Sequence, residues 1–422
     1  LIVIRVRNFS WKIKIGYNLM NIQGLHEIDI YTNLYPLDIN GREINIYSLH
    51  NVVPQGVNLL YPNTLLLSNG KKLFRPIDET VMSLGDAVNK CNFSSVSEEF
   101  TKVIVTPVFF FVYNTDNYYH FVYDTLPYLI SFNHLRKEIP ELKLLMGYPN
   151  EDKSNHYKFV TEFLEILNIT EDDILMIDED TRYDKIYISS TYTYGDDPNK
   201  PPREEVYGLY RKMVCDEITD TQPKKIYISR RSWVHGDLSN IGTNYTTRRS
   251  LTNEDELVTV LVSFGYTEIF TETMTTKEKI SMFSNATSVI GAIGGGLCNV
   301  LFSGNDCELI PIVSPGFLDI NERFLHSFVN TNLKLFMDTS HTEIGTLKTH
   351  MRVKHNSTIG EIMAIDGSDV TLSFSESPIA GWNNSVNYST IIVKYGECEQ
   401  LDNGLNSPWT MDIEKLKHKH LK

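Results

Sequence analysis

Three consecutive glycines, Gly294, Gly295 and Gly296, lie in the segment SVIGAIGGGLCNVLF, between an apolar strand pattern and a helical pattern. Glycine lets the backbone approach a ligand closely. The start of a helix then presents unpaired N–H groups and a positive dipole end to a phosphate group. The spacing differs from the G-x-G-x-x-G of nicotinamide-binding units. The segment indicates either a diphosphate-binding turn or a tight strand–helix turn without a ligand.

Two arginine pairs accompany the glycines. Arg230 and Arg231 end the strand pattern KKIYISRR, and Arg248 and Arg249 precede the helical pattern NEDELVTVLVSFG. The carboxyl ends of parallel strands and the loops after them line the ligand crevice of an α/β sheet. Guanidinium groups there can bind phosphate bidentately. The pairs therefore predict contacts to a diphosphate, with a solvated basic patch as the alternative.

A histidine and a carboxylate share one face of an expected helix in NYYHFVYDTLPYL. His120 and Asp124 are four residues apart, which places them on consecutive helical turns. An imidazole or a carboxylate at the mouth of a cleft can remove a proton from an incoming hydroxyl group. The alternative, non-catalytic interpretation is a structural histidine beside a surface aspartate. Pro127 must kink or interrupt the same helix.

Further carboxylates offer two other kinds of contact. Glu254 and Glu256 begin the helix after the second arginine pair, where they suit either a ribose hydroxyl or the capping of the helix N-terminus. Asp178 and Asp180 form a D-x-D match, which can hold a divalent metal on a nucleotide sugar. The surrounding sequence is acidic throughout, so chance also explains the match.

Bulk composition narrows the class of protein. The 422 residues are 41% hydrophobic and 22% charged, as in a globular protein of two or three domains. A formal net charge of −14 opposes binding to a nucleic-acid backbone. No apolar run reaches 18 residues, so we expect no membrane span. Five sparse cysteines indicate reduced thiols and a cytoplasmic location. The alternative is a secretory lumen, reached by a chain whose N-terminal anchor has been removed.

The order of elements predicts four regions. Residues 1–100 read as a β-rich N-terminal region with turn residues between short apolar runs. Strand and helix patterns alternate over 101–220 and again over 221–345, which predicts two α/β units with parallel sheets. Residues 346–422 read as a β-rich tail. The fold class expected is therefore α/β, with β-rich regions at both ends of the chain.

The order of these motifs resembles glycosyltransferase family 61. The resemblance rests on YYHFVYDTLPYL, KKIYISRR, RRSLTNEDELVTVLVSFGYTEIF and KISMFSNATSVIGAIGGGLCNVLFSGNDCELIPI, over roughly residues 100–315. It implies a GT-B architecture of two facing Rossmann-like domains, with 101–220 taking the acceptor and 221–345 the donor. It also implies an inverting enzyme that moves a GlcNAc-like or xylose-like sugar from a UDP-sugar to a glycan or glycoprotein. No cofactor is required, and a divalent metal is not expected.

The resemblance carries over to particular positions. Residues that match the family's motifs are the H-x-x-x-D element, the arginines and the glycine-rich loop: His120, Asp124, Arg230, Arg248, Arg249, Gly294, Gly295, Gly296 and Asn299. One departure matters. Members typically read G-x-H-G-A-G-L in the loop, whereas Ile293 replaces the histidine here, which implies a differently held donor or reduced activity. The next strand ends ELIPI rather than V-I-E-[IL], so a second ribose contact is also in question.

The working hypothesis is direct displacement with inversion. Asp124, assisted by His120, removes the acceptor proton, while Arg230, Arg249 and the glycine amides stabilise the departing diphosphate. One alternative is a metal-dependent, single-domain glycosyltransferase that uses Asp178 and Asp180. Another is a non-catalytic glycan-binding protein on the same fold.

Overall fold

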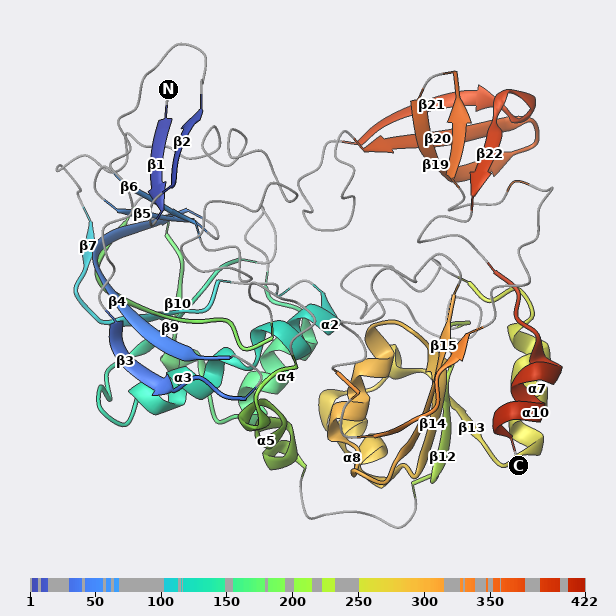
Figure 1. Cartoon of the computed structure of the whole chain (residues 1–422), viewed down its shortest axis with the longest axis horizontal. Helices are drawn as coiled ribbons and strands as arrows, with labels where there is room; N and C mark the ends of the chain where they lie inside the picture. The colour runs from blue at the N-terminus through green and yellow to red at the C-terminus, as the bar shows by residue number, and fades with distance from the viewer. Residues whose placement is uncertain are drawn as a thin grey trace. The chain divides into compact units, whose positions relative to one another are not determined.

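The chain divides into two compact units, Leu1–Lys212 and Met213–Lys422. The computed structural model describes residues 2–6, 9–13, 30–39, 42–55, 58–61, 64–67, 102–112, 115, 117–148, 155–178, 181–193, 201–214, 222–231, 250–314, 327–328, 331–337, 347, 352–356, 358–375, 388–402 and 409–421 (Figure 1).

The first unit is built on a sheet that is parallel on one side and antiparallel on the other. Its parallel strands lie in the order β10-β9-β8-β11, and β11 then pairs antiparallel with β4. The short β7 also pairs with β11, and β3, β5 and β6 extend the β4 side. The strands are β3 (Ile30–Tyr35), β4 (Ile44–Gln55), β5 (Asn58–Tyr61), β6 (Thr64–Leu67), β7 (Val103–Ile104), β8 (Val108–Phe110), β9 (Lys143–Met146), β10 (Ile174–Met176) and β11 (Arg182–Ser189).

The order in which the chain adds strands to this sheet reverses between β8 and β11. The chain runs outward from β8 through β9 to β10 and then returns to the other side of β8 as β11. Val108, Phe109 and Phe110 in β8 are all fully buried, as expected of a strand covered on both faces. Ligands of open α/β sheets bind at the carboxyl ends of the strands that flank such a reversal. Among the described residues of this unit, the α-helices are α2 (Tyr118–His120), α3 (Tyr128–Leu135), α4 (Lys158–Ile166) and α5 (Glu204–Met213).

A π-helical turn, Phe121–Thr125, interrupts the helix that follows β8. The N–H of Leu126 donates to Phe121 O at 2.9 Å, one residue further back than in an α-helix. Pro127 follows and has no N–H of its own. The carbonyl of Val122 therefore has no backbone donor in this turn, and Tyr210 Oη in α5 donates to it instead at 2.7 Å. The interruption expected at Pro127 is confirmed, and it takes the form of a π turn.

The second unit contains an all-parallel sheet in the order β13-β12-β14-β15-β16, with β17 also paired to β15. This is the 2-1-3-4-5 order of a doubly wound fold, whose crevice lies between the first and third strands along the chain, β12 and β14. Its elements are β12 (Lys225–Ile228), α7 (Glu254–Ser263), β13 (Thr267–Ile269), α8 (Thr276–Asn285), β14 (Ser288–Ala292), β15 (Glu308–Val313), β16 (Asn332–Leu333) and β17 (Phe336–Met337). A 3₁₀ helix, Gly295–Phe302, follows β14.

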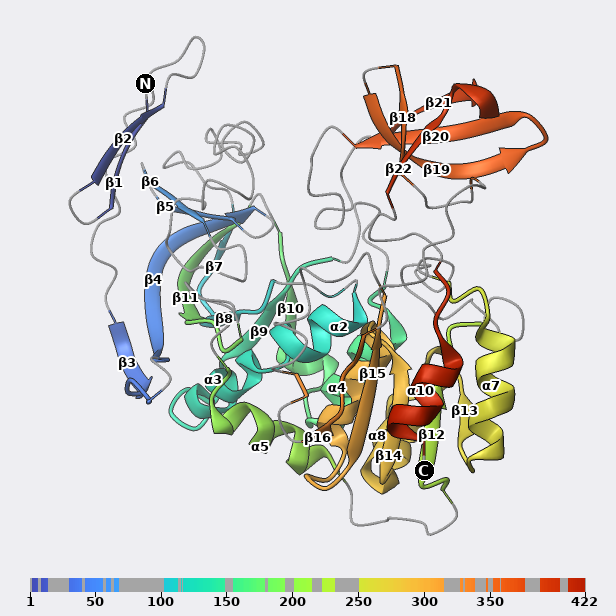
Figure 2. The ribbon, with the colours of Figure 1, turned by 45° about the vertical axis from the view of Figure 1, so that its right-hand side comes forward.

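The end of the chain belongs to the core of this sheet. Trp409, Met411 and Leu416 are buried in one cluster with side chains of α7 and of the sheet. Trp409 exchanges backbone hydrogen bonds with the chain just before α7, and the amide of Asn253 pairs with both backbone groups of Met411. Helix α10 (Ile413–His420) thereby covers the same sheet face as α7, while α8 lies on the other face (Figures 1 and 2).

The remaining strands form a small antiparallel sheet in the order β21-β20-β19-β18-β22. Its apolar core contains Val353, Ile362, Val370 and Leu372. The strands are β18 (Arg352–His355), β19 (Thr358–Asp366), β20 (Asp369–Ser375), β21 (Tyr388–Lys394) and β22 (Glu399–Asp402), and near the N-terminus β1 (Ile2–Val6) pairs with β2 (Phe9–Ile13). The expectation of an α/β protein with parallel sheets is confirmed. The tail, read from sequence as β-rich, also contains helix α10.

Candidate functional site

Arg230 and the glycine loop meet where the strand order of the second unit reverses, between β12 and β14. Arg230 follows β12, and Gly294 follows β14, the neighbouring parallel strand. A Cβ placed on Gly294 would lie 2.8 Å from Arg230 Nη1, so the guanidinium group rests directly on the glycine backbone. A Cβ on Gly296 would lie 2.7 Å from the Oγ1 of Thr271, which follows β13. The glycines are thus required by close packing around Arg230 and Thr271.

Glu254 fixes the turn that carries Arg230. Its buried Oε1 accepts hydrogen bonds from Tyr227 Oη at 2.7 Å, from Ser229 Oγ at 3.1 Å and from the Arg230 backbone N–H at 2.7 Å. Burial raises the pKa of the Glu254 carboxyl, and these hydrogen bonds oppose the shift. Through these three hydrogen bonds, Glu254 holds the end of β12 and the following turn in place.

A carboxylate that sequence reasoning missed lies beside Arg230. Glu272 follows β13, the strand on the other side of β12, and its buried Oε1 has no hydrogen-bond partner among the described residues. Burial lowers the pKa of the Arg230 guanidinium, and the charges of Glu254 and Glu272 oppose that shift. The signal was present in YTEIFTE, where an acidic residue lies three positions after the end of β13.

The other predicted donor residues take varied positions. Arg231 forms a bidentate pair with Glu268 at 2.7 Å and a further ion pair with Asp255. Glu256 is exposed on α7, and Asn299 is buried with its amide donating to Gly296 O at 2.8 Å. Gly295 is half-buried in the loop. Arg248 and Arg249 lie outside the described residues.

His120 and Asp124 contact each other in the first unit, in the helix that follows β8. His120 Nδ1 lies 2.7 Å from Asp124 Oδ2, and Thr193 Oγ1 donates to Asp124 Oδ1 at 3.0 Å. His120 and Asp124 come from the helix after β8, whereas Thr193 comes from the segment after β11. The side chain of Asp124 is 5% exposed and that of His120 is 16% exposed. This arrangement resembles the part of a catalytic triad in which a buried carboxylate orients an imidazole.

A buried arginine holds the third member of this cluster. Arg42 donates to the carbonyl of Thr193 at 3.1 Å and to the carbonyl of Pro201 at 2.7 Å. Arg203 in turn donates to the carbonyl of Arg42 at 3.1 Å. Because Arg42 lies just before β4, the N-terminal strands of this unit help to position the segment that contacts Asp124.

The acidic D-x-D match is only partly described. Asp178 pairs with Lys102 at 2.8 Å, and its backbone N–H donates to Tyr183 Oη at 3.2 Å. Asp180 lies outside the described residues. Within the described part of the chain, no group of three or more metal-ligating side chains is found, and no helix has the length and apolarity to cross a membrane.

A comparison with known protein families finds a match to part of the chain. Residues 118–310 match the family model described as Glycosyltransferase 61. The family resemblance expected from the sequence motifs is thereby confirmed, and the family implies glycosyltransferase activity. A search of curated proteins finds no match.

The segment matched by the family model contains both groups of candidate site residues. His120, Asp124 and Thr193 lie near its beginning and middle, and Arg230 and Gly294 lie toward its end. Ile293, which stands where the family pattern has a histidine, is 4% exposed, and its backbone N–H donates to Ile312 O at 3.0 Å. In this family 61 region the loop therefore has a buried apolar side chain just before the glycines.

Proposed function

We propose that this protein is an inverting glycosyltransferase of the GT-B class that moves a GlcNAc-like or xylose-like sugar from a UDP-sugar to a hydroxyl group of a glycan or glycoprotein. The observation that carries the proposal is the contact between Arg230 and Gly294 at the strand reversal of the second unit. There a cation lies against a glycine backbone that leads into a helix, the combination that suits a diphosphate.

Donor binding in this proposal uses the ends of three strands. Arg230 and the amides of Gly294 to Gly296 neutralise the diphosphate as it leaves the sugar. Glu272 accepts a hydrogen bond from a ribose hydroxyl through its buried Oε1, which has no donor among the described residues. Glu254 already accepts three protein hydrogen bonds, so we assign it to holding Arg230 in place.

Proton removal from the acceptor is assigned to His120. Both oxygens of Asp124 are bound within the first unit, one by His120 and one by Thr193, and its side chain is the more buried of the pair. A carboxylate bonded to Nδ1 favours the imidazole tautomer whose Nε2 can accept a proton. As the acceptor oxygen attacks the anomeric carbon, its proton passes to His120 and the bond to UDP breaks with inversion. Asp124 then acts as the residue that positions and stabilises the imidazole.

A thermal-shift screen with UDP-, GDP- and CMP-sugars tests the donor assignment, because a ligand that binds only the folded state raises the midpoint of unfolding. We expect UDP-sugars to stabilise the protein and an Arg230→Ala variant to lose that shift. No response to any nucleotide sugar would contradict the proposal.

The proposed mechanism needs no divalent metal, so transfer should persist in EDTA. Loss of transfer in EDTA would favour a metal-dependent enzyme, and UDP binding without transfer would favour a non-catalytic binding protein.

A further inference from the structure

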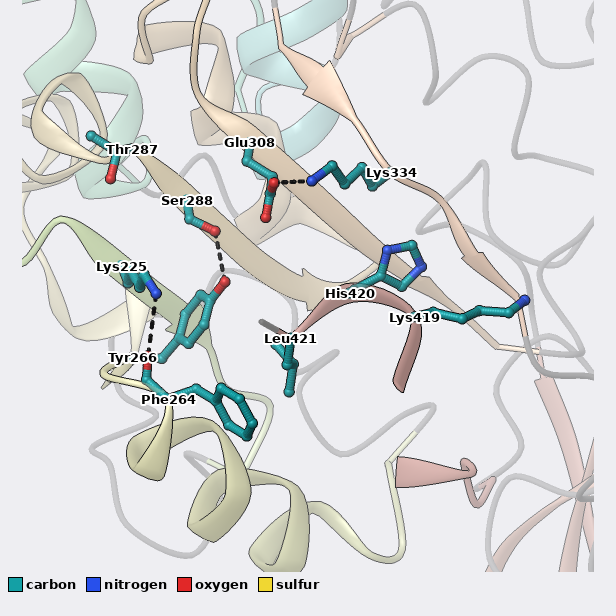
Figure 3. A pocket seen from close by; sticks show the side chains of 10 residues that line it. All are labelled: Lys225, Phe264, Tyr266, Thr287, Ser288, Glu308, Lys334, Lys419, His420 and Leu421. Atoms are coloured by element: carbon teal, nitrogen blue, oxygen red, sulfur yellow. Dashed lines mark hydrogen bonds and ion pairs between the residues drawn. The ribbon is translucent and has the colours of Figure 1, made fainter. Parts of the chain in front are cut away.

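A cavity opens at the amino edge of the parallel sheet in the second unit. Its volume is about 560 Å³. Strand starts line one side, and the end of helix α10 lines the other (Figure 3). The lining side chains are Lys225, Phe264, Tyr266, Thr287, Ser288, Glu308, Lys334, Lys419, His420 and Leu421. The glycine loop and Arg230 lie at the carboxyl edge of the same sheet, so this cavity is separate from the proposed donor site.

Positive charge is concentrated around this cavity. Three lysines line it, Lys225, Lys334 and Lys419, whereas Glu308 is the carboxylate among its lining residues. The whole chain carries a formal net charge of −14, so such an excess of cations departs from the average surface. His420 also lines the cavity. Burial lowers the pKa of His420, and the charges of Lys334 and Lys419 lower it further.

Two of these lysines have hydrogen-bond or ion-pair partners within the protein. Lys225 Nζ donates to Phe264 O at 3.3 Å, at the end of α7, and Lys334 forms an ion pair with Glu308. Basic side chains near a helix C-terminus also offset the helix dipole, but a helix end corresponds to about half a charge. Lys225 faces a neutral carbonyl and Lys419 adds a further positive charge, so the cavity stays cationic once these partners are counted.

Other lining residues provide apolar surface that suits the carbon skeleton of an organic ligand. Phe264, Tyr266 and Leu421 supply apolar surface, and Tyr266 Oη bonds to Ser288 Oγ at 2.7 Å. Figure 3 shows Tyr266, Ser288 and Glu308 on the strand side and His420 and Leu421 on the helix side. We propose that this cavity binds a small organic anion, which presents a phosphate or carboxylate group to Lys334, Lys419 and His420.

Such a ligand would not touch the reacting donor. The cavity begins at Ser288, the first residue of β14, and the glycine loop follows Ala292, the last residue of that strand. Five residues of strand separate the two edges by roughly 15 Å. The ligand would instead connect α10 to the sheet that α10 covers, and its binding should stabilise the attachment of that helix.

Isothermal titration calorimetry with the whole chain tests the inference. The probes are inorganic phosphate, glucose 6-phosphate and glucuronate, with neutral glucose as the uncharged control. We expect at least one anion to bind while glucose does not. Preference for glucose 6-phosphate would assign a phosphate ligand, and preference for glucuronate a carboxylate. Lys419→Glu should weaken binding by at least about tenfold, since hydrogen bonds to charged groups contribute on that scale.

Two variants distinguish binding in this cavity from binding elsewhere on the chain. Lys417→Glu introduces the same charge change on the same helix, but Lys417 pairs with Glu414 and does not line the cavity, so binding should persist. Arg230→Ala, which tests the proposed donor site, should also leave this binding intact. The inference is overturned if no anion binds in the millimolar range. It is also overturned if Lys419→Glu and Lys417→Glu bind equally well, or if binding is lost in Arg230→Ala.

Discussion

The guanidinium group of Arg230 rests on the α-carbon of Gly294, so close that an added Cβ would lie 2.8 Å from Nη1. The backbone of Gly294 is extended, with φ 173°, a conformation that any residue can adopt. Space for the arginine, and not backbone conformation, therefore requires glycine at this position.

Replacing Gly294 by alanine should move Arg230 away from the strand reversal. We expect the affinity for UDP to fall by about tenfold or more, because a charge-assisted contact is lost. Titration calorimetry with UDP measures the effect. Gly304→Ala is the matched control, since a Cβ there meets nothing within 4 Å. Equal UDP affinity in the two variants would contradict the assignment of Arg230 to the diphosphate.

Asp124→Asn should greatly reduce transfer while UDP affinity stays nearly unchanged. An asparagine cannot stabilise the imidazolium that forms when His120 takes a proton, and general-base catalysis contributes roughly 10²- to 10⁴-fold. Initial rates with a UDP-sugar, compared with UDP binding, separate the two effects. Turnover equal to that of the unaltered protein would eliminate this pair from the mechanism.

The rate of sugar transfer by the His120→Ala variant distinguishes His120 from Asp124 as the general base. If the imidazole takes the proton, added imidazole should partly restore the rate of this variant by occupying the space that the side chain leaves. If Asp124 takes the proton directly, added imidazole should have no effect. The rate is measured as a function of imidazole concentration, with Asp124→Ala as the variant that imidazole should not restore.

Tyr210→Phe should disturb the π turn that carries Asp124. The Tyr210 hydroxyl is the donor to Val122 O, because Leu126 N–H is used by Phe121 O and Pro127 has no N–H. A buried carbonyl left without a donor costs about 1–3 kcal/mol. Denaturant unfolding measures this loss. Pro127→Ala restores an N–H near that carbonyl, so the loss should be smaller in the double variant, and strictly additive effects would contradict this role of Tyr210.

Local sequence pattern predicted much of the fold and part of the site. Apolar runs rich in β-branched residues predicted the strands, and their alternation with helical patterns predicted parallel sheets. The four-residue spacing predicted that His120 and Asp124 share a face, because that relation depends on one helix alone. The glycine loop and Arg230 were predicted to face one crevice, since both follow strands.

Relations between distant segments could not be predicted in the same way. Thr193 contacts Asp124 only because β11 returns to lie beside β8, and no local pattern encodes that pairing. Trp409 packs into the second sheet through contacts with residues near Leu251, far earlier in the chain. Sequence pattern reports which side chains favour burial, but the partners that bury them are set by the assembled fold.

Glu254→Gln should change how stability depends on pH. Burial raises the pKa of the Glu254 carboxyl in the folded protein above its ordinary value of 4.5. Between that value and the raised folded pKa, the folded state binds more protons than the unfolded chain. The stabilisation that this carboxyl contributes is therefore present at low pH. It is lost as the pH rises from 4.5 through the raised folded pKa.

The glutamine variant keeps an oxygen that can accept from Tyr227, Ser229 and the Arg230 backbone, but it does not titrate. Its urea midpoint should therefore fall less than that of the unaltered protein as the pH rises from 4.5 toward 7. Other groups titrate alike in both proteins, so the difference between the two curves isolates Glu254. Parallel curves would mean that the carboxyl keeps its ordinary pKa in the fold. Glu254→Ala removes the acceptor as well and should be less stable at every pH, because three buried donors lose their partner.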